Sequence, residues 1–187
     1  MSPSKQRLPA SLAVAAALTP LLTATPSTLA ARAAAAPPSG KPTAAERALL
    51  HSHELWATID VCSPPDQPNT VGVRGSMPGN GHAHDTMYMS FRLQYMTAGK
   101  SWMDVAGGAS SGWERVGDGA SPRQGGASFA LKAPSGKRPV TLRGVVDFQW
   151  RSGHTVLLTA VEPTSTGHKS LAGADPASYS AASCVLG

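Results

Sequence analysis

Residues 86–96 have the sequence Thr-Met-Tyr-Met-Ser-Phe-Arg-Leu-Gln-Tyr-Met, the clearest alternation of apolar and polar side chains in this chain. The apolar or aromatic positions are Met87, Met89, Phe91, Leu93 and Tyr95, and the polar positions between them include Ser90, Arg92 and Gln94. Successive side chains of a strand point to opposite faces, so a period of two over this length predicts a half-buried β-strand. A helix would scatter the same residues around its circumference.

Shorter alternating stretches lie on both sides of this one. Residues 54–62 place four side chains on one face (Leu55, Ala57, Ile59, Val61) and four on the other (Trp56, Thr58, Asp60, Cys62). Residues 141–151 alternate as well, Ser152-Gly153 predicts a hairpin turn after them, and a last strand is expected over 179–186. Roughly eight or nine short strands separated by Gly- and Pro-rich turns predict an all-β domain, a two-sheet antiparallel sandwich.

The composition excludes several classes of protein. Of the 187 residues 41% are hydrophobic and only 14% charged, too few charges for a disordered, charge-rich chain. Three of the 16 basic residues and none of the 11 acidic ones precede residue 34, which leaves a formal charge of +2 for the remainder. These basic residues are scattered rather than clustered, so we expect no nucleic-acid partner.

Residues 1–33 have the three parts of a secretory signal peptide. Lys5 and Arg7 form the positive start, residues 8–22 form an apolar run, and Ala31-Arg32-Ala33 offers small residues for cleavage. An uncleaved membrane anchor is the alternative, which the interrupting prolines Pro9, Pro20 and Pro26 disfavour. We therefore expect a secreted or extracytoplasmic protein with no membrane span after cleavage of the signal.

The chain then divides into two further parts. Residues 34–53 form an Ala- and Pro-rich tether, in which Thr43-Ala-Ala-Glu46 has the spacing of a capping box and predicts a short helix. Residues 54–187 form the sandwich domain.

Cys62 and Cys184 are the two cysteines of the chain, 122 residues apart. In an exported protein such a pair predicts a disulfide, here one that joins the first strand to the last. Two unpaired buried thiols are the alternative.

Three segments carry a resemblance to a family. They are Trp56-Ala-Thr-Ile-Asp-Val-Cys62, Asp147-Phe-Gln-Trp-Arg151, and the closing Gly173-Ala-Asp-Pro with Tyr179-Ser-Ala-Ala-Ser-Cys184. Together they resemble uncharacterised exported immunoglobulin-like β-sandwich proteins of high-GC bacteria over most of residues 54–187. The resemblance implies an immunoglobulin-like fold and an extracytoplasmic location, and it implies no reaction. The cysteine pair differs from that of antibody-type domains, because it links the ends of the domain.

His82-Ala-His84-Asp85 is the candidate metal site. Two histidines at i and i+2 can bind one cation, with Asp85 as a third ligand, and nearby Met87 and Met89 would add thioethers of the kind copper favours. The alternative is a solvated loop followed by two methionines that fill core space.

No catalytic motif points to an enzyme. The chain has no G-x-S-x-G, no H-E-x-x-H, and no glycine pattern of a dinucleotide or phosphate site. Trp102 and Trp113 lie near short, glycine-flanked strands and are candidates for surface binding, with core packing as the alternative. We therefore expect a non-enzymatic exported binding domain without a cofactor, whose partner is an unknown protein or carbohydrate. A metal-binding, copper-type protein that uses His82 and His84 is the alternative.

Overall fold

The computed structural model describes residues 41–107, 109–132, 138–168 and 172–187. The chain divides after Ala33, and every described residue belongs to the unit Ala34–Gly187. The predicted signal peptide and residues 34–40 of the predicted tether lie outside the described residues. Among the described residues, no helix has both the length and the apolar character that crossing a membrane requires.

A short helix, α1 (Ala44–Leu50), precedes the strands. The Thr43 hydroxyl accepts from the amide of Glu46, and the Glu46 carboxylate accepts from the amide of Thr43, so the predicted capping box is confirmed. These two bonds occupy amide groups that the first turn of a helix leaves without a partner.

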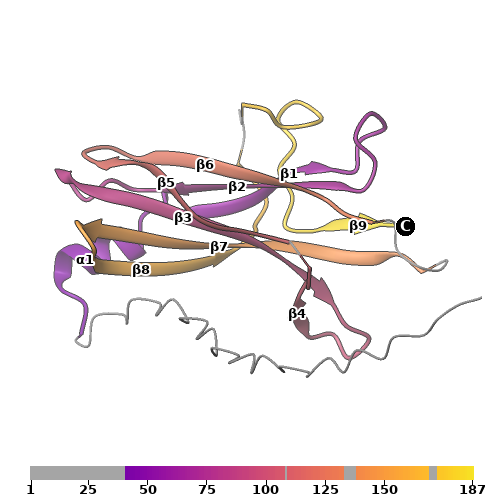
Figure 1. Cartoon of the computed structure of the whole chain (residues 1–187), viewed down its shortest axis with the longest axis horizontal. Helices are drawn as coiled ribbons and strands as arrows, with labels where there is room; N and C mark the ends of the chain where they lie inside the picture. The colour runs from indigo at the N-terminus through magenta and orange to yellow at the C-terminus, as the bar shows by residue number, and fades with distance from the viewer. Residues whose placement is uncertain (1–40, 108, 133–137, 169–171) are drawn as a thin grey trace, which may run out of the picture. The chain divides into compact units, whose positions relative to one another are not determined.

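Two antiparallel sheets form the domain, as the alternation predicted (Figure 1). The small sheet has the order β1-β2-β6 and consists of β1 (Trp56–Cys62), β2 (Thr70–Met77) and β6 (Arg123–Ala130). The large sheet contains β3 (His82–Met96), β4 (Trp102–Asp104), β5 (Ser110–Gly119), β7 (Val140–Ser152), β8 (Thr155–Pro163) and β9 (Cys184–Leu186).

The centre of the large sheet is the pairing of β3 with β7. Along its other edge β3 pairs first with β5 and then with β4, and the other edge of β7 pairs with β9 and then β8. The expected strand over 179–186 is shorter than predicted, because only Cys184–Leu186 pair with β7 in a continuous ladder.

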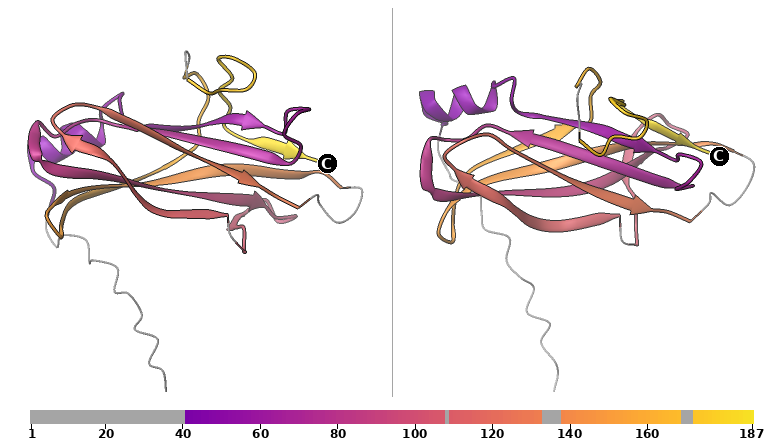
Figure 2. Two further views of the ribbon diagram at one scale, coloured as in Figure 1. Left: turned by 45° about the horizontal axis from the view of Figure 1, so that its top comes forward. Right: turned by 90° about the horizontal axis from the view of Figure 1, so that it is seen from above.

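The core lies between the two sheets, which face each other (Figure 2). The alternate apolar positions of residues 86–96 point into it: Met87, Met89, Phe91 and Leu93 are fully buried. Two glycines let the sheets approach closely. A Cβ on Gly75 would lie 3.1 Å from Val146, and a Cβ on Gly144 would lie 2.7 Å from Val73.

A β-bulge in β1 changes the predicted faces of that strand. Ile59 pairs with Val73 and Val61 with Gly72, so Asp60 is an extra residue in the ladder. One extra residue moves every later side chain to the opposite face. Our prediction that Cys62 shares a face with Trp56 was therefore wrong.

The bulge turns Cys62 inward, opposite the buried Val71 of the small sheet. There it forms the predicted disulfide with Cys184 of the large sheet, with Cα atoms 5.5 Å apart. The bond thus joins the two sheets as well as the two ends of the domain.

The outer face of β1 is covered by the segment that leads from β8 to β9. Thr58 is fully buried, and its hydroxyl donates to the carbonyl of Ser165 at 2.7 Å. Along the free edge of β1, Ile59 and Ala181 exchange two backbone hydrogen bonds, and Trp56 stacks on His168 with ring centroids 4.2 Å apart. Figure 2 shows this yellow segment alongside the purple β1. Both faces of β1 are therefore buried, although its sequence pattern predicted one buried face.

Candidate binding face

The outer face of the large sheet carries both of the candidate tryptophans. Directly paired residues of neighbouring strands point to the same side. Trp113 pairs with Ser90 and Trp102 with Met96, and these β3 positions alternate with the buried ones, so both tryptophans point away from the core. We call this surface the outer face; it is formed by the outward side chains of β3, β4, β5, β7 and β8.

The first aromatic cluster of the outer face is formed by Trp113, Tyr88 and Arg151. The Arg151 guanidinium carbon lies 4.0 Å from the ring centroid of Tyr88 and 5.3 Å from that of Trp113. Arg151 donates from Nε to Oε1 of Gln149 at 2.7 Å, and a second bond from Nη2 goes to the same oxygen. With 44% of its surface exposed, Trp113 is the most accessible of these rings to a ligand.

The second aromatic cluster lies toward the other end of β3 and consists of Trp102 and Arg143. The guanidinium carbon of Arg143 lies 4.5 Å from the Trp102 ring centroid. Arg143 Nε donates to Gln94 Oε1 at 2.9 Å, and Gln94 Nε2 donates to Asp104 Oδ1 at 2.8 Å. Both hydrogen bonds fix the arginine in place over the indole.

A small ion-pair network separates the two clusters. Arg92 bonds to Asp147 on β7, and its Nε lies 3.4 Å from Asp104 Oδ1 on β4. Burial raises the pKa of the Asp147 carboxyl above its ordinary value, and the charge of Arg92 opposes that rise. The middle of the outer face is therefore polar and charge-paired.

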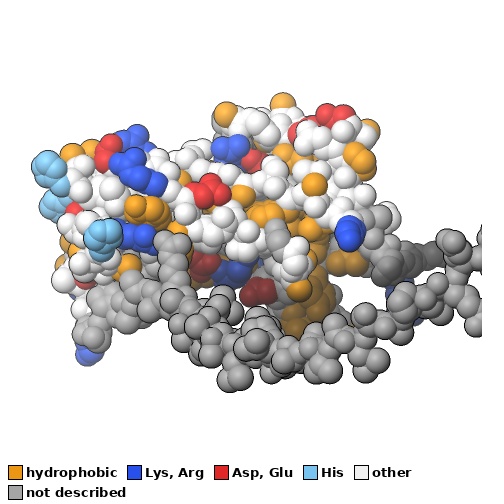
Figure 3. Space-filling model, viewed as in Figure 1, with side chains coloured by type: hydrophobic (Ala, Val, Ile, Leu, Met, Phe, Trp, Pro, Cys, Tyr) orange, Lys and Arg blue, Asp and Glu red, His pale blue; other side chains and the backbone are white. Residues whose placement is uncertain are grey.

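The candidate metal residues occupy a different place from the one predicted. His82, His84 and Asp85 lie within the first residues of β3, whereas we predicted a loop that precedes the strand. His82 pairs with Gly119 of β5 and the next pair is Thr86 with Asp118, so Ala83, His84 and Asp85 bulge out of the ladder between them. Both histidines are exposed, and in Figure 3 histidine side chains gather at the end of the domain where α1 lies.

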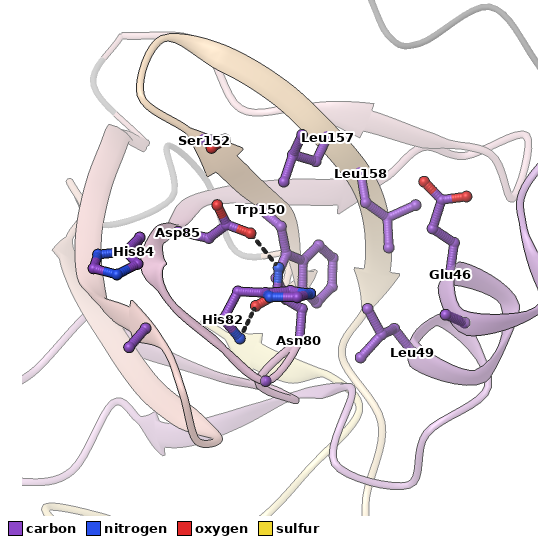
Figure 4. Close-up of a pocket in the computed structure, with 13 residues that line it drawn as sticks. Glu46, Leu49, Asn80, His82, His84, Asp85, Trp150, Ser152, Leu157 and Leu158 are labelled. Atoms are coloured by element: carbon purple, nitrogen blue, oxygen red, sulfur yellow. Dashed lines mark hydrogen bonds between the residues drawn. The ribbon is translucent and has the colours of Figure 1, made fainter.

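Asp85 is buried and already has a partner, since its Oδ2 accepts from Asn80 Nδ2 at 2.8 Å (Figure 4). The surrounding cavity of about 710 Å³ lies between α1 and the adjoining ends of β3, β7 and β8. In the part of the chain that the structure describes, no three His, Cys, Asp or Glu side chains gather closely enough to hold a metal ion. Met87 and Met89 are core residues, as the alternative interpretation predicted.

One serine–histidine contact was not singled out from the sequence. Ser165 Oγ lies 3.1 Å from His168 Nε2 and donates to the Ala57 carbonyl at 3.3 Å. The serine hydroxyl thus contacts both the backbone and the imidazole, and the ring itself stacks on Trp56. This arrangement holds the segment against β1.

The two tryptophans of the outer face were predicted from the sequence, whereas Tyr88, Arg143 and Arg151 were not. All three occupy the polar positions of strands whose apolar positions were recognised. The available signal was this alternation, which assigns residues to a face. It does not tell which strands are neighbours, and the stacking depends on that.

Searches against protein-family models, curated proteins and solved structures found no match to this chain.

Proposed function

We propose that this protein is an exported, non-enzymatic binding domain of immunoglobulin-like type, whose outer face holds an extended polysaccharide. The observation that carries the proposal is the difference between the two sheets. The small sheet has its β1 face covered by the protein's own chain, whereas the outer face of the large sheet presents aromatic rings on rigid strands. Binding groups held on strands are positioned more accurately than those on loops.

The chemistry of the outer face suits a sugar polymer. Indole and phenol rings offer a flat apolar surface beside a polar edge, and the face of a sugar ring is also apolar with polar edges. Ser90 and Thr159 occupy outward, partly exposed positions between and beside the rings, where their hydroxyl groups can exchange hydrogen bonds with sugar hydroxyls.

A protein partner is the less favoured occupant. The centre of a protein–protein interface is depleted of charged residues. Here the centre holds the Arg92 network with Asp104 and Asp147. The two aromatic clusters also lie far apart: Ser90 and Met96, which pair with the two tryptophans, are separated by about 20 Å along β3 at about 3.3 Å per residue. A ligand that contacts both clusters must therefore be at least about 20 Å long.

Export is supported by two independent features. The first 33 residues have the pattern of a signal peptide. The Cys62–Cys184 disulfide belongs to an oxidising environment, such as the one outside the cytoplasm.

Affinity electrophoresis of residues 41–187 through gels that contain either a neutral β-glucan or polygalacturonate tests the proposal. We expect at least one polysaccharide to retard the domain, and Trp113→Ala to weaken that retardation about tenfold, whereas Trp113→Phe keeps most of it. His154→Ala, an exposed change in the β7–β8 turn, is the control and should bind as the parent does. Failure of both polysaccharides to retard the parent, or equal retardation of Trp113→Ala, would show that the proposal is wrong.

A further inference from the structure

We infer that the ligand of the outer face is acidic, a polysaccharide that carries carboxylate groups, and that Arg143 and Arg151 bind those carboxylates. This inference rests on the proposed polysaccharide function and adds the chemical class of the polymer. It comes from the arginines of the outer face, which differ in whether a carboxylate neutralises them.

Four arginines share the outer face. Arg92 is paired with Asp104 and Asp147. Arg143, Arg151 and Arg115, which is exposed opposite Tyr88 on β5, have no carboxylate within ion-pair distance among the described residues. By contrast, Arg74 and Arg123 outside this face each pair with an aspartate. Because Arg92 is shared by two aspartates, Asp104 and Asp147, the four arginines of the outer face exceed these two carboxylates by two positive charges.

Two of these arginines are held in place before any ligand binds. Arg151 lies over Tyr88 and Arg143 over Trp102, and each donates from Nε to the side-chain oxygen of a glutamine. A guanidinium has five N–H donors. The Nη1 group of Arg151 and both Nη groups of Arg143 make no hydrogen bond to another described residue, so they remain to bind a ligand.

This arrangement fits a carboxylate. The planar fork of a guanidinium matches two carboxylate oxygens with parallel hydrogen bonds, and such charge-assisted bonds are stronger than neutral ones. Stacking on an aromatic ring fixes the plane of the fork, which lowers the entropy lost when the ligand binds. Beside the Arg151 fork lies the exposed ring of Trp113, on which the sugar carrying that carboxylate can rest. Arg143 and Arg151 are eight residues apart on β7, about 26 Å along the strand at about 3.3 Å per residue, and this separation also matches a polymer that repeats its charge.

Polygalacturonate and its fully methyl-esterified form separate the contribution of the carboxylates, because the two polymers share one backbone and differ in charge. Titration calorimetry should show that the parent domain binds polygalacturonate at least tenfold more tightly than the ester. Arg143→Gln and Arg151→Gln should each weaken binding of polygalacturonate about five- to tenfold, the loss expected for a charge-assisted hydrogen bond. Arg151→Lys keeps the charge but not the fork, and it should recover less than half of that loss.

Arg47→Gln, on α1 and outside the outer face, is the matched control, since it removes the same charge and should change affinity less than about twofold. Thermal melting checks that each variant is folded. Equal affinity for polygalacturonate and its ester would overturn the inference and leave the polysaccharide function standing. Equal affinity for polyglutamate and polygalacturonate would instead overturn the polysaccharide function, and absence of binding to all three polymers would overturn the inference.

Discussion

Removing the disulfide should destabilise the domain by about 2–5 kcal/mol. The bond connects residues 122 apart in the chain. In the loop-closure model, releasing a loop of this length raises the entropy of the denatured chain by an amount worth about 5 kcal/mol at 25 °C, which sets the upper end of the range. Residual structure in the denatured chain lowers the loss toward the bottom of the range.

The double variant Cys62→Ser with Cys184→Ser tests this value. Cys184 is buried, so a serine hydroxyl there would add a cost of its own, and the pair Cys62→Ala with Cys184→Ala separates that cost from the loss of the cross-link. Urea unfolding of the alanine pair and of the reduced parent should give losses that agree to within about 1 kcal/mol, and the serine pair should lose more, by the cost of its buried hydroxyl. For a domain of this size the melting temperature should fall by about 2–4 °C per kcal/mol.

The position of the bond adds a local expectation. β9 is held to the large sheet by three residue pairs with β7, and the disulfide is its covalent link to the small sheet. Amide hydrogen exchange in β9 should therefore accelerate more than exchange in the centre of β3. A loss of stability below about 1 kcal/mol, or two reactive thiols in the denatured parent without reductant, would refute this account of how the domain is closed.

Three further perturbations test the packing, the titration and the histidines. Gly144→Ala should lower the free energy of unfolding in urea by about 1–3 kcal/mol, because its Cβ would lie 2.7 Å from both methyl groups of Val73. Gly99→Ala is the control and should lower it little, because the nearest neighbour of its Cβ is 3.8 Å away. Equal losses would contradict the close approach of the sheets. Burial lowers the pKa of His168, so as the pH falls the denatured state binds this proton before the folded state does. The free energy of unfolding should therefore fall as the pH drops below about 6.5. A His168→Gln variant whose free energy of unfolding depends equally steeply on pH between about pH 5 and 7 would contradict this. His82→Ala with His84→Ala should change stability by less than about 1 kcal/mol in metal-free buffer, since both side chains are exposed, and a larger loss in thermal melting would mean that the pair is structural.

The local features of the fold could be predicted because each depends on residues close together in the chain. The alternation in residues 86–96 gives β3 one buried and one outward face, and Thr43 with Glu46 caps α1. The two cysteines were also matched correctly, since the chain contains no other pair. Side-chain periodicity and short-range hydrogen bonds determine such features before any tertiary contact forms.

The candidate binding face needed the pairing of strands. Trp102 and Trp113 were recognised individually, but Arg143 and Arg151 are brought to the aromatic rings by the β3–β7 ladder and by β4 and β5 on its other side. The order of strands in a sheet depends on contacts between residues distant in the chain. Alternation in a single strand has no information about which strand becomes its neighbour.

By itself, then, the sequence determined that this chain forms antiparallel strands with one apolar face each, a capped helix and a single cross-link. Tertiary structure alone decided that Asp60 forms a bulge, which turns Cys62 inward, and that residues 164–168 and 172–183 cover β1 but leave the outer face of the large sheet open. The physical reason is that the first set of features arises from the periodicity of neighbouring residues. The second set arises from strand register and from the path of a connection across a sheet, which only the packing of the complete domain selects.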